Sequence, residues 1–158
     1  MLQASSPWIK IGKNYVGAYA RSHHRPAAAL VVRGGPDTLP KLQTHARRTA
    51  RAWCLDGVPL FGISVFCALD DIGPASLPGL LNSRLRTYRC IHYCPVSALR
   101  LVGVHLLPTG HRPHFTAVIA SDEEDELRRL LACLGPHREN PYRMPPPRGR
   151  RGGDRDHR

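Results

Sequence analysis

The longest apolar run in the chain, Val58–Leu69 (VPLFGISVFCAL), constrains the fold more than any other segment. Side chains alternate between the two faces of a strand, and here both sets of alternate positions are mostly apolar. This pattern is typical of a strand at the centre of a sheet, where other elements cover both faces. Pro59 fits the start of such a strand, and Gly62 fits a bulge or a close approach between backbones. The run is too short to cross a bilayer as a helix.

Two segments have the periodicity of amphipathic helices. From Leu39 to Trp53, apolar residues recur every three or four positions, and basic and polar residues occupy the opposite side. Ser121 and Glu124 form a Ser-x-x-Glu capping-box pattern, and four leucines follow at helical spacing. The acidic cluster 122–126 suits the positive end of that second helix. Both helices therefore offer one apolar face for packing on a sheet.

Shorter patterns complete the prediction of a single α/β domain, with α+β as the alternative. Its sheet is expected to be mixed and to be packed by the two main amphipathic helices. The compact domain is predicted to span residues 27–135. A partly ordered arm, 1–26, precedes it, and a disordered basic tail rich in Arg, Pro and Gly, 136–158, follows it. The other expected elements are strands at 27–32, 87–94, 104–107 and 114–120 and helices at 76–85 and 95–101.

The chain of 158 residues carries a net charge of +11, most of it located before the acidic cluster. Fourteen Lys and Arg face four acids in that part, and the whole chain has twenty Arg and three Lys. Arg binds phosphate through a planar fork of donors, so this balance favours partners with phosphate or carboxylate groups. A GC-rich genome produces the same excess of Arg, which is the alternative explanation. The candidate phosphate or nucleic-acid contacts are Arg33, Arg47, Arg48, Arg51 and Arg112.

His114 and Thr116 are the catalytic candidates. They lie two residues apart on an expected strand, so their side chains share one face. There a histidine exchanges a proton with an oxygen while a hydroxyl donates to a phosphate oxygen. The pattern resembles one half of the paired His-x-Thr motif of the two-histidine phosphoesterases. The chain contains no second His-x-Thr or His-x-Ser, and a packed pair at a strand end is the alternative interpretation.

Arg33 and Ser64 indicate a different site. Arg33 ends an expected strand, a helix follows, and Ser64 lies inside the central strand. This order resembles the layout of the ADP-ribosyltransferases, in which such an Arg and Ser hold NAD and a later strand carries a catalytic carboxylate. In this chain that later strand carries His114 and Thr116 instead. NAD binding through Arg33 and Ser64 is therefore an alternative hypothesis.

Cysteines and missing motifs set further limits. Five cysteines, most of them within apolar runs, favour reduced thiols in a cytoplasmic protein, and the N-terminus shows no signal peptide. Cys90, His92 and Cys94 alternate on one strand face, but ligands on a straight strand splay apart, so zinc is not expected. Common phosphate-loop, zinc-protease and serine-hydrolase motifs do not occur. We predict no metal, no cofactor and no insertion into a membrane.

Three classes of function remain open from the sequence. In the first, the protein acts on or binds RNA or another phosphate-bearing substrate, as a small toxin-like ribonuclease does. In the second, it binds NAD in the manner of an ADP-ribosyltransferase. The third is a non-catalytic regulatory module that binds nucleic acid or an acidic protein. Whether the protein is an enzyme, and which oligomer it forms, stay open.

Overall fold

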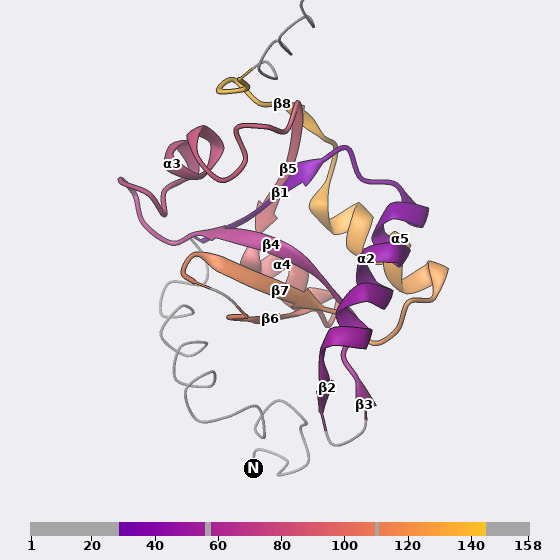
Figure 1. Ribbon diagram of the computed structural model, residues 1–158. Helices are drawn as coiled ribbons and strands as arrows, with labels where there is room; N and C mark the ends of the chain where they lie inside the picture. The colour runs from indigo at the N-terminus through magenta and orange to yellow at the C-terminus, as the bar shows by residue number, and fades with distance from the viewer. Residues whose placement is uncertain (1–28, 56–57, 110, 145–158) are drawn as a thin grey trace, which may run out of the picture.

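Strand β4 is one of the two central strands of the main sheet, as the apolar run predicts (Figure 1). It spans Gly62–Ala68, and the apolar run Val58–Leu69 also contains a second, shorter strand. The earlier one, β3 (Val58–Pro59), pairs with β2 (Cys54–Leu55) in a small separate sheet. The remaining elements, in chain order, are β1 (Leu30–Gly35), α2 (Leu39–Ala52), α3 (Leu77–Asn82), β5 (Cys90–Pro95), α4 (Val96–Leu101), β6 (His105–Leu107), β7 (His114–Val118), α5 (Glu124–Leu134) and β8 (Arg138–Glu139).

The computed structural model describes residues 29–55, 58–109 and 111–144. The expected N-terminal arm, 1–26, lies outside these residues. Within them, sheet and helices form one compact domain of mixed α and β content, as predicted.

The main sheet has six strands in the order β6-β7-β4-β1-β5-β8. Each neighbouring pair in it is antiparallel, whereas the sequence predicts a mixed sheet. Alternation of strands and helices along a chain is typical of parallel neighbours. Here the strands that lie side by side run in opposite directions even where a helix separates them in the sequence. The arrangement corresponds to the α+β alternative.

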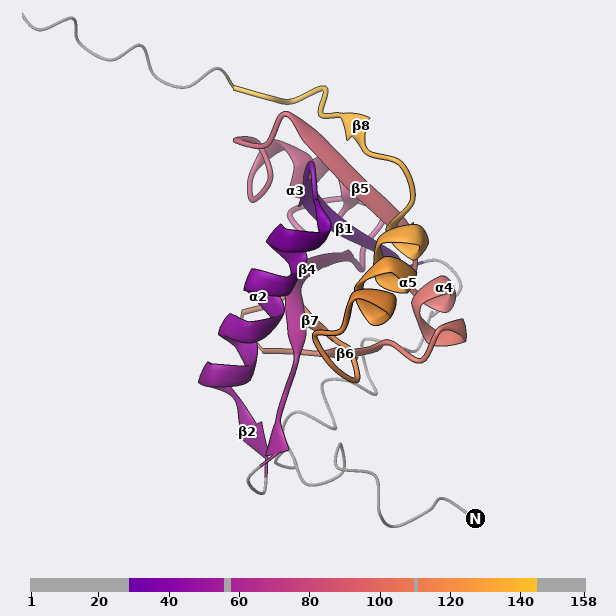
Figure 2. The same cartoon turned by 90° about the vertical axis from the view of Figure 1, so that its right-hand side faces the viewer.

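Helices α2 and α5 lie side by side on one face of the sheet (Figure 2). Their apolar faces meet inward side chains of the sheet, including Val31, Val65 and Phe115. Leu42 of α2 and Leu130 of α5 are completely buried there. The amphipathic pattern of both segments is therefore confirmed, and these two helices cover the main core.

A smaller core lies on the opposite face of the sheet, under helix α3 and the loop that follows it. Val32 and Ile91 contribute to it from the sheet, and Leu80 and Leu85 contribute from α3 and the loop. Packing on both faces explains why the central strands carry apolar residues at successive positions.

Residues after α5 remain part of the domain. Strand β8 pairs with β5 at the edge of the sheet. The buried Asn140 donates from Nδ2 to the carbonyl oxygens of Leu85, at 2.9 Å, and Tyr88, at 3.3 Å. Residues 136–144, which the sequence pattern groups with the basic tail, therefore hold the loop before β5 in place. The rest of that expected tail, 145–158, lies outside the described residues.

The start of α5 differs from the predicted capping box. The helix begins at Glu124 after the N-cap residue Glu123, and Ser121 Oγ accepts a hydrogen bond from Glu123 N at 3.3 Å. The Glu124 carboxylate forms an ion pair with Arg128 one turn further on. Because the first turn is still acidic, the favourable interaction with the positive end of the helix is retained.

Candidate functional site

Strands β1 and β4 separate after Val32 and Phe66, the last residues that pair between them. Arg33, the next residue of β1, bridges the two strands at this point. Its Nη1 donates to the carbonyl oxygen of Ser64 at 2.6 Å, in place of a hydrogen bond between backbones. Only 6% of Arg33 is exposed, and a buried guanidinium requires partners for its charge.

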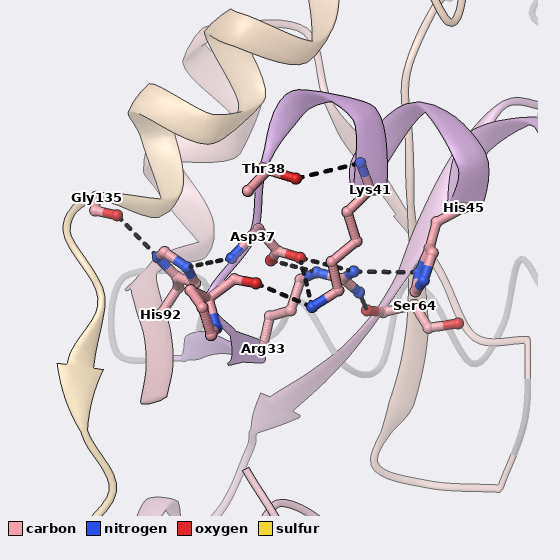
Figure 3. Close-up of polar contacts among 9 residues, drawn as sticks. Arg33, Asp37, Thr38, Lys41, His45, Ser64, His92 and Gly135 are labelled. Atoms are coloured by element: carbon pink, nitrogen blue, oxygen red, sulfur yellow. Dashed lines mark hydrogen bonds and ion pairs between the residues drawn. The ribbon is translucent and has the colours of Figure 1, made fainter. Parts of the chain in front are cut away.

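Asp37 provides the negative charge that Arg33 requires. Its fully buried carboxylate accepts from Arg33 Nε at 2.6 Å through Oδ2 and from Nη2 at 3.1 Å through Oδ1 (Figure 3). Lys41 Nζ lies 3.5 Å from Oδ1 and donates to the carbonyl oxygen of Pro36 at 3.0 Å. A two-point pair of this kind fixes both the position and the direction of the guanidinium.

His45 contacts the same guanidinium from helix α2. The side chains of Lys41 and His45 both point from the helix toward Arg33 (Figure 3), and His45 Nδ1 lies 3.2 Å from Arg33 Nη2. A guanidinium only donates hydrogen bonds, so Nδ1 accepts and the proton of the neutral ring is on Nε2. Burial, followed by the charge of Arg33, lowers the pKa of His45 below its ordinary value of 6.5. At neutral pH the ring is therefore uncharged, with a donor at Nε2.

A cavity of about 180 Å³ lies between helix α2, the separated strands and the loop before β5. Helix α2 contributes Lys41, His45, Arg48 and Thr49, which are spaced so that one stripe of the helix faces the cavity. None of the described residues that line it is acidic. The other lining residues are Arg33, Gly34, Ser64, Phe66, Leu85 and Tyr88.

Two of the five predicted phosphate-binding arginines, Arg33 and Arg48, line this cavity. Arg51 is exposed almost one turn further along α2 and does not line it. The structure therefore brings the arginine at the end of one strand together with one of the helix arginines.

The two remaining predicted arginines have acidic partners elsewhere. Arg47 Nε lies 2.6 Å from Asp122 Oδ2, and this ion pair joins α2 to the segment that leads into α5. Arg112 Nη2 lies 2.9 Å from Asp70 Oδ1 in an exposed pair between two loops. Neither arginine lines the cavity.

His114 and Thr116 share one face of β7, as predicted, and lie beside the cavity rather than in its wall. Thr116 is buried, and its hydroxyl is 2.7 Å from that of Thr109. The His114 ring meets Phe66 edge-on with 5.5 Å between centroids, and burial lowers the pKa of His114 below 6.5. The cavity residues Ser64 and Phe66 of β4 pair with Thr116 and His114 of β7, respectively. The predicted catalytic pair therefore adjoins the cavity.

His92 has partners at both ring nitrogens. Nε2 accepts from Asp37 N at 3.4 Å, and Nδ1 lies 2.9 Å from the carbonyl oxygen of Gly135, so the ring proton is on Nδ1. His92 thus links β5 to the start of α2 and the end of α5.

Among the described residues, no group of three or more His, Cys, Asp or Glu could hold a metal ion. Burial, and then Cys133, raises the pKa of Cys94 to about 12, so that thiol is protonated at neutral pH.

Lys41, His45 and Tyr88 are among the seven cavity residues that are not predicted site residues. For two of them the sequence holds a signal, because Lys41, His45 and Arg48 follow one another at steps of four and three. Tyr88 has no comparable signal. Its position depends on a contact with Gly34, which is distant in the sequence.

Comparisons with protein families, with curated protein sequences and with solved structures find no match for this chain. Within the ranges that the structure describes, no helix is long and apolar enough to cross a membrane. The function of the site must therefore be inferred from its own residues and their geometry.

Proposed function

We propose that this protein binds a phosphate-bearing ligand, such as RNA or a nucleotide, in the cavity beside helix α2. The observation that carries the proposal is the composition of the cavity wall. Lys41 and Arg48 present positive charge, and no acidic side chain of the described residues lines the cavity. The Nε2–H of His45 adds a neutral donor. Ammonium, guanidinium and imidazole N–H groups together form a donor set suited to phosphate oxygens.

The charge around the cavity supports the same proposal. Arg33, Lys41 and Arg48 bring three positive charges, and the carboxylate of Asp37 offsets one of them. The remaining charge of two matches a phosphate monoester, which carries about −1.5 to −2 at neutral pH. A concave site with low-dielectric walls attracts such an anion more strongly than the same charges on an open surface do.

Binding of a fluorescent 5′-phosphorylated oligoribonucleotide tests the proposal. The logarithm of the association constant is expected to fall linearly with the logarithm of the salt concentration. For two phosphate contacts the slope for a single strand is about −1.4. Inorganic pyrophosphate is expected to compete. Affinity that does not respond to salt, or to pyrophosphate, would contradict phosphate binding in this cavity.

NAD is the second candidate ligand, because Arg33 and Ser64 line the same cavity. Their direct contact uses the Ser64 carbonyl oxygen, and Asp37 occupies the other side of the guanidinium. If the cavity is specific for NAD, millimolar NAD raises the Tm of the protein more than AMP does at the same concentration. Equal shifts would remove the NAD hypothesis and leave the shared phosphate chemistry.

RNA cleavage by His114 and Thr116 is a further hypothesis within the proposed function. Both residues adjoin Ser64 and Phe66. An RNA chain bound in the cavity therefore reaches them if it continues over β4 toward β7. His114 is half-buried and its lowered pKa favours the neutral ring, the form that accepts a proton from a hydroxyl. Cleavage of a labelled oligoribonucleotide that persists in His114→Ala would remove this hypothesis.

A further inference from the structure

The cavity has a second, aromatic wall on the side of the loop before β5. The ring of Tyr88 packs directly over the backbone of Gly34, where a Cβ would overlap the ring atoms Cγ, Cδ1 and Cδ2. Phe66 and Leu85 continue this apolar wall. Cationic side chains of α2 and apolar side chains of the loop and sheet therefore line one and the same cavity.

Tyr88 is anchored in the fold and still accessible. Its backbone N donates to the carbonyl oxygen of Leu85 at 3.0 Å, and its own carbonyl oxygen accepts from Asn140 Nδ2 at 3.3 Å. Forty per cent of the residue is exposed. Aromatic rings that are fixed and accessible in this way bind nucleic-acid bases by stacking, largely without regard to which base is present.

Phe66 is fixed as well. It lies on β4 and meets the His114 ring edge-on, at an interplanar angle of 80°. The aromatic wall is thus held by the loop on one side and by the sheet on the other, and it does not need to rearrange to receive a planar group. A wall prepared in this way reduces the entropic cost of binding.

We propose that the cavity takes a nucleoside monophosphate unit, with the phosphate toward Lys41 and Arg48 and the base against Tyr88. This inference rests on the phosphate-binding function proposed above and names its ligand class. Inorganic phosphate alone would leave the apolar wall without a partner. With about 180 Å³, the cavity is smaller than the ~300–1,000 Å³ of typical ligand clefts, so it excludes a duplex and receives at most one nucleotide unit.

Isothermal titration calorimetry of the full chain with UMP, ribose 5-phosphate and inorganic phosphate tests the inference. UMP is expected to bind about tenfold more tightly than ribose 5-phosphate, because only UMP has a base to stack. Tyr88→Phe is expected to keep this preference, and Tyr88→Leu is expected to reduce it to less than about threefold. Circular dichroism verifies the fold of both variants.

The outcomes separate this inference from the proposed function. Equal affinity for UMP and ribose 5-phosphate would overturn the nucleotide unit and leave phosphate binding intact, whereas no binding of any of the three would overturn both. The ligand series uses the unaltered chain, so it decides the question even if Tyr88→Leu does not fold. If a 5′-phosphorylated trinucleotide displaces bound UMP, the ligand is the 5′ end of a nucleic-acid chain. If only mononucleotides displace bound UMP, the ligand is a free nucleotide. Either result supports the inference.

Discussion

Arg33 and Asp37 form a buried two-point ion pair across the junction between strand β1 and helix α2. The pair neutralises a charge inside the domain and directs the guanidinium to Ser64 and His45. Backbone N of Asp37 also donates to His92 of β5. Because β1, β4, β5 and α2 all contact this pair, the shape of the cavity depends on it.

Asp37→Asn is expected to lower the free energy of unfolding by about 3–5 kcal/mol, because it leaves the Arg33 charge buried without a carboxylate. Urea denaturation followed by circular dichroism measures this change. Asp71→Asn removes a carboxylate at an exposed position and is the matched control, with an expected change below about 0.5 kcal/mol. Similar small effects of the two substitutions would show that the buried pair is unimportant for stability.

Asn140→Ala is expected to destabilise the protein by about 1–3 kcal/mol, because it leaves buried carbonyl oxygens of the loop before β5 without their donor. The same change releases the loop that holds Tyr88. Thermal denaturation measures the effect, with the exposed Asn82→Ala as control. If both variants melt at the temperature of the unaltered protein, Asn140 does not hold the loop.

The stability of the protein is expected to decrease in mild acid. Burial lowers the pKa of His45, His105 and His114 from 6.5, so the unfolded chain takes up protons before the folded protein does. The contribution of these three histidines to the free energy of unfolding therefore falls as the pH drops below about 6.5, until their folded pKa values are reached. Urea midpoints at a series of pH values record this decrease.

His45→Asn isolates one contribution to this pH dependence. The Asn side chain offers an oxygen near the position of Nδ1, so it keeps an acceptor for Arg33 but does not titrate. The decrease in stability between about pH 6.5 and 5 is expected to be shallower in this variant. An unchanged decrease would mean that His45 is not held neutral in the folded protein.

His114→Ala is expected to change the affinity for a 5′-phosphorylated oligoribonucleotide by less than about threefold, because His114 does not line the cavity. Fluorescence anisotropy provides the measurement. A much larger loss of affinity, with the fold intact, would place His114 within the binding site and would extend the site from β4 to β7.

Apolar patterning predicted the layers of the fold, because burial determines which residues are apolar. Val58–Leu69 contains a central strand, and the two amphipathic segments are the helices that cover the main core. Strand direction was not predictable in this way, because antiparallel and parallel strands bury the same kinds of side chain. Pairing partners far apart in the chain, and not local pattern, decide the direction.

The candidate site was predictable only in part. Arg33 and Ser64 were expected to lie together, and they line one cavity, but their contact uses a backbone carbonyl oxygen that no side-chain pattern encodes. The role of Asn140 depends on Leu85 and Tyr88, more than fifty residues away in the chain. Residues that act through such distant contacts carry no local signal in the sequence.

The most direct test of phosphate binding compares Arg48→Ala with Arg51→Ala. Both substitutions remove one positive charge from α2, but only Arg48 lines the cavity. We expect Arg48→Ala to weaken the binding of a 5′-phosphorylated oligoribonucleotide about tenfold or more, because it removes a charge-assisted hydrogen bond, and Arg51→Ala to weaken it less than about threefold. Equal losses in the two variants would show that the helix attracts phosphate only through its overall charge and that the cavity is not the binding site.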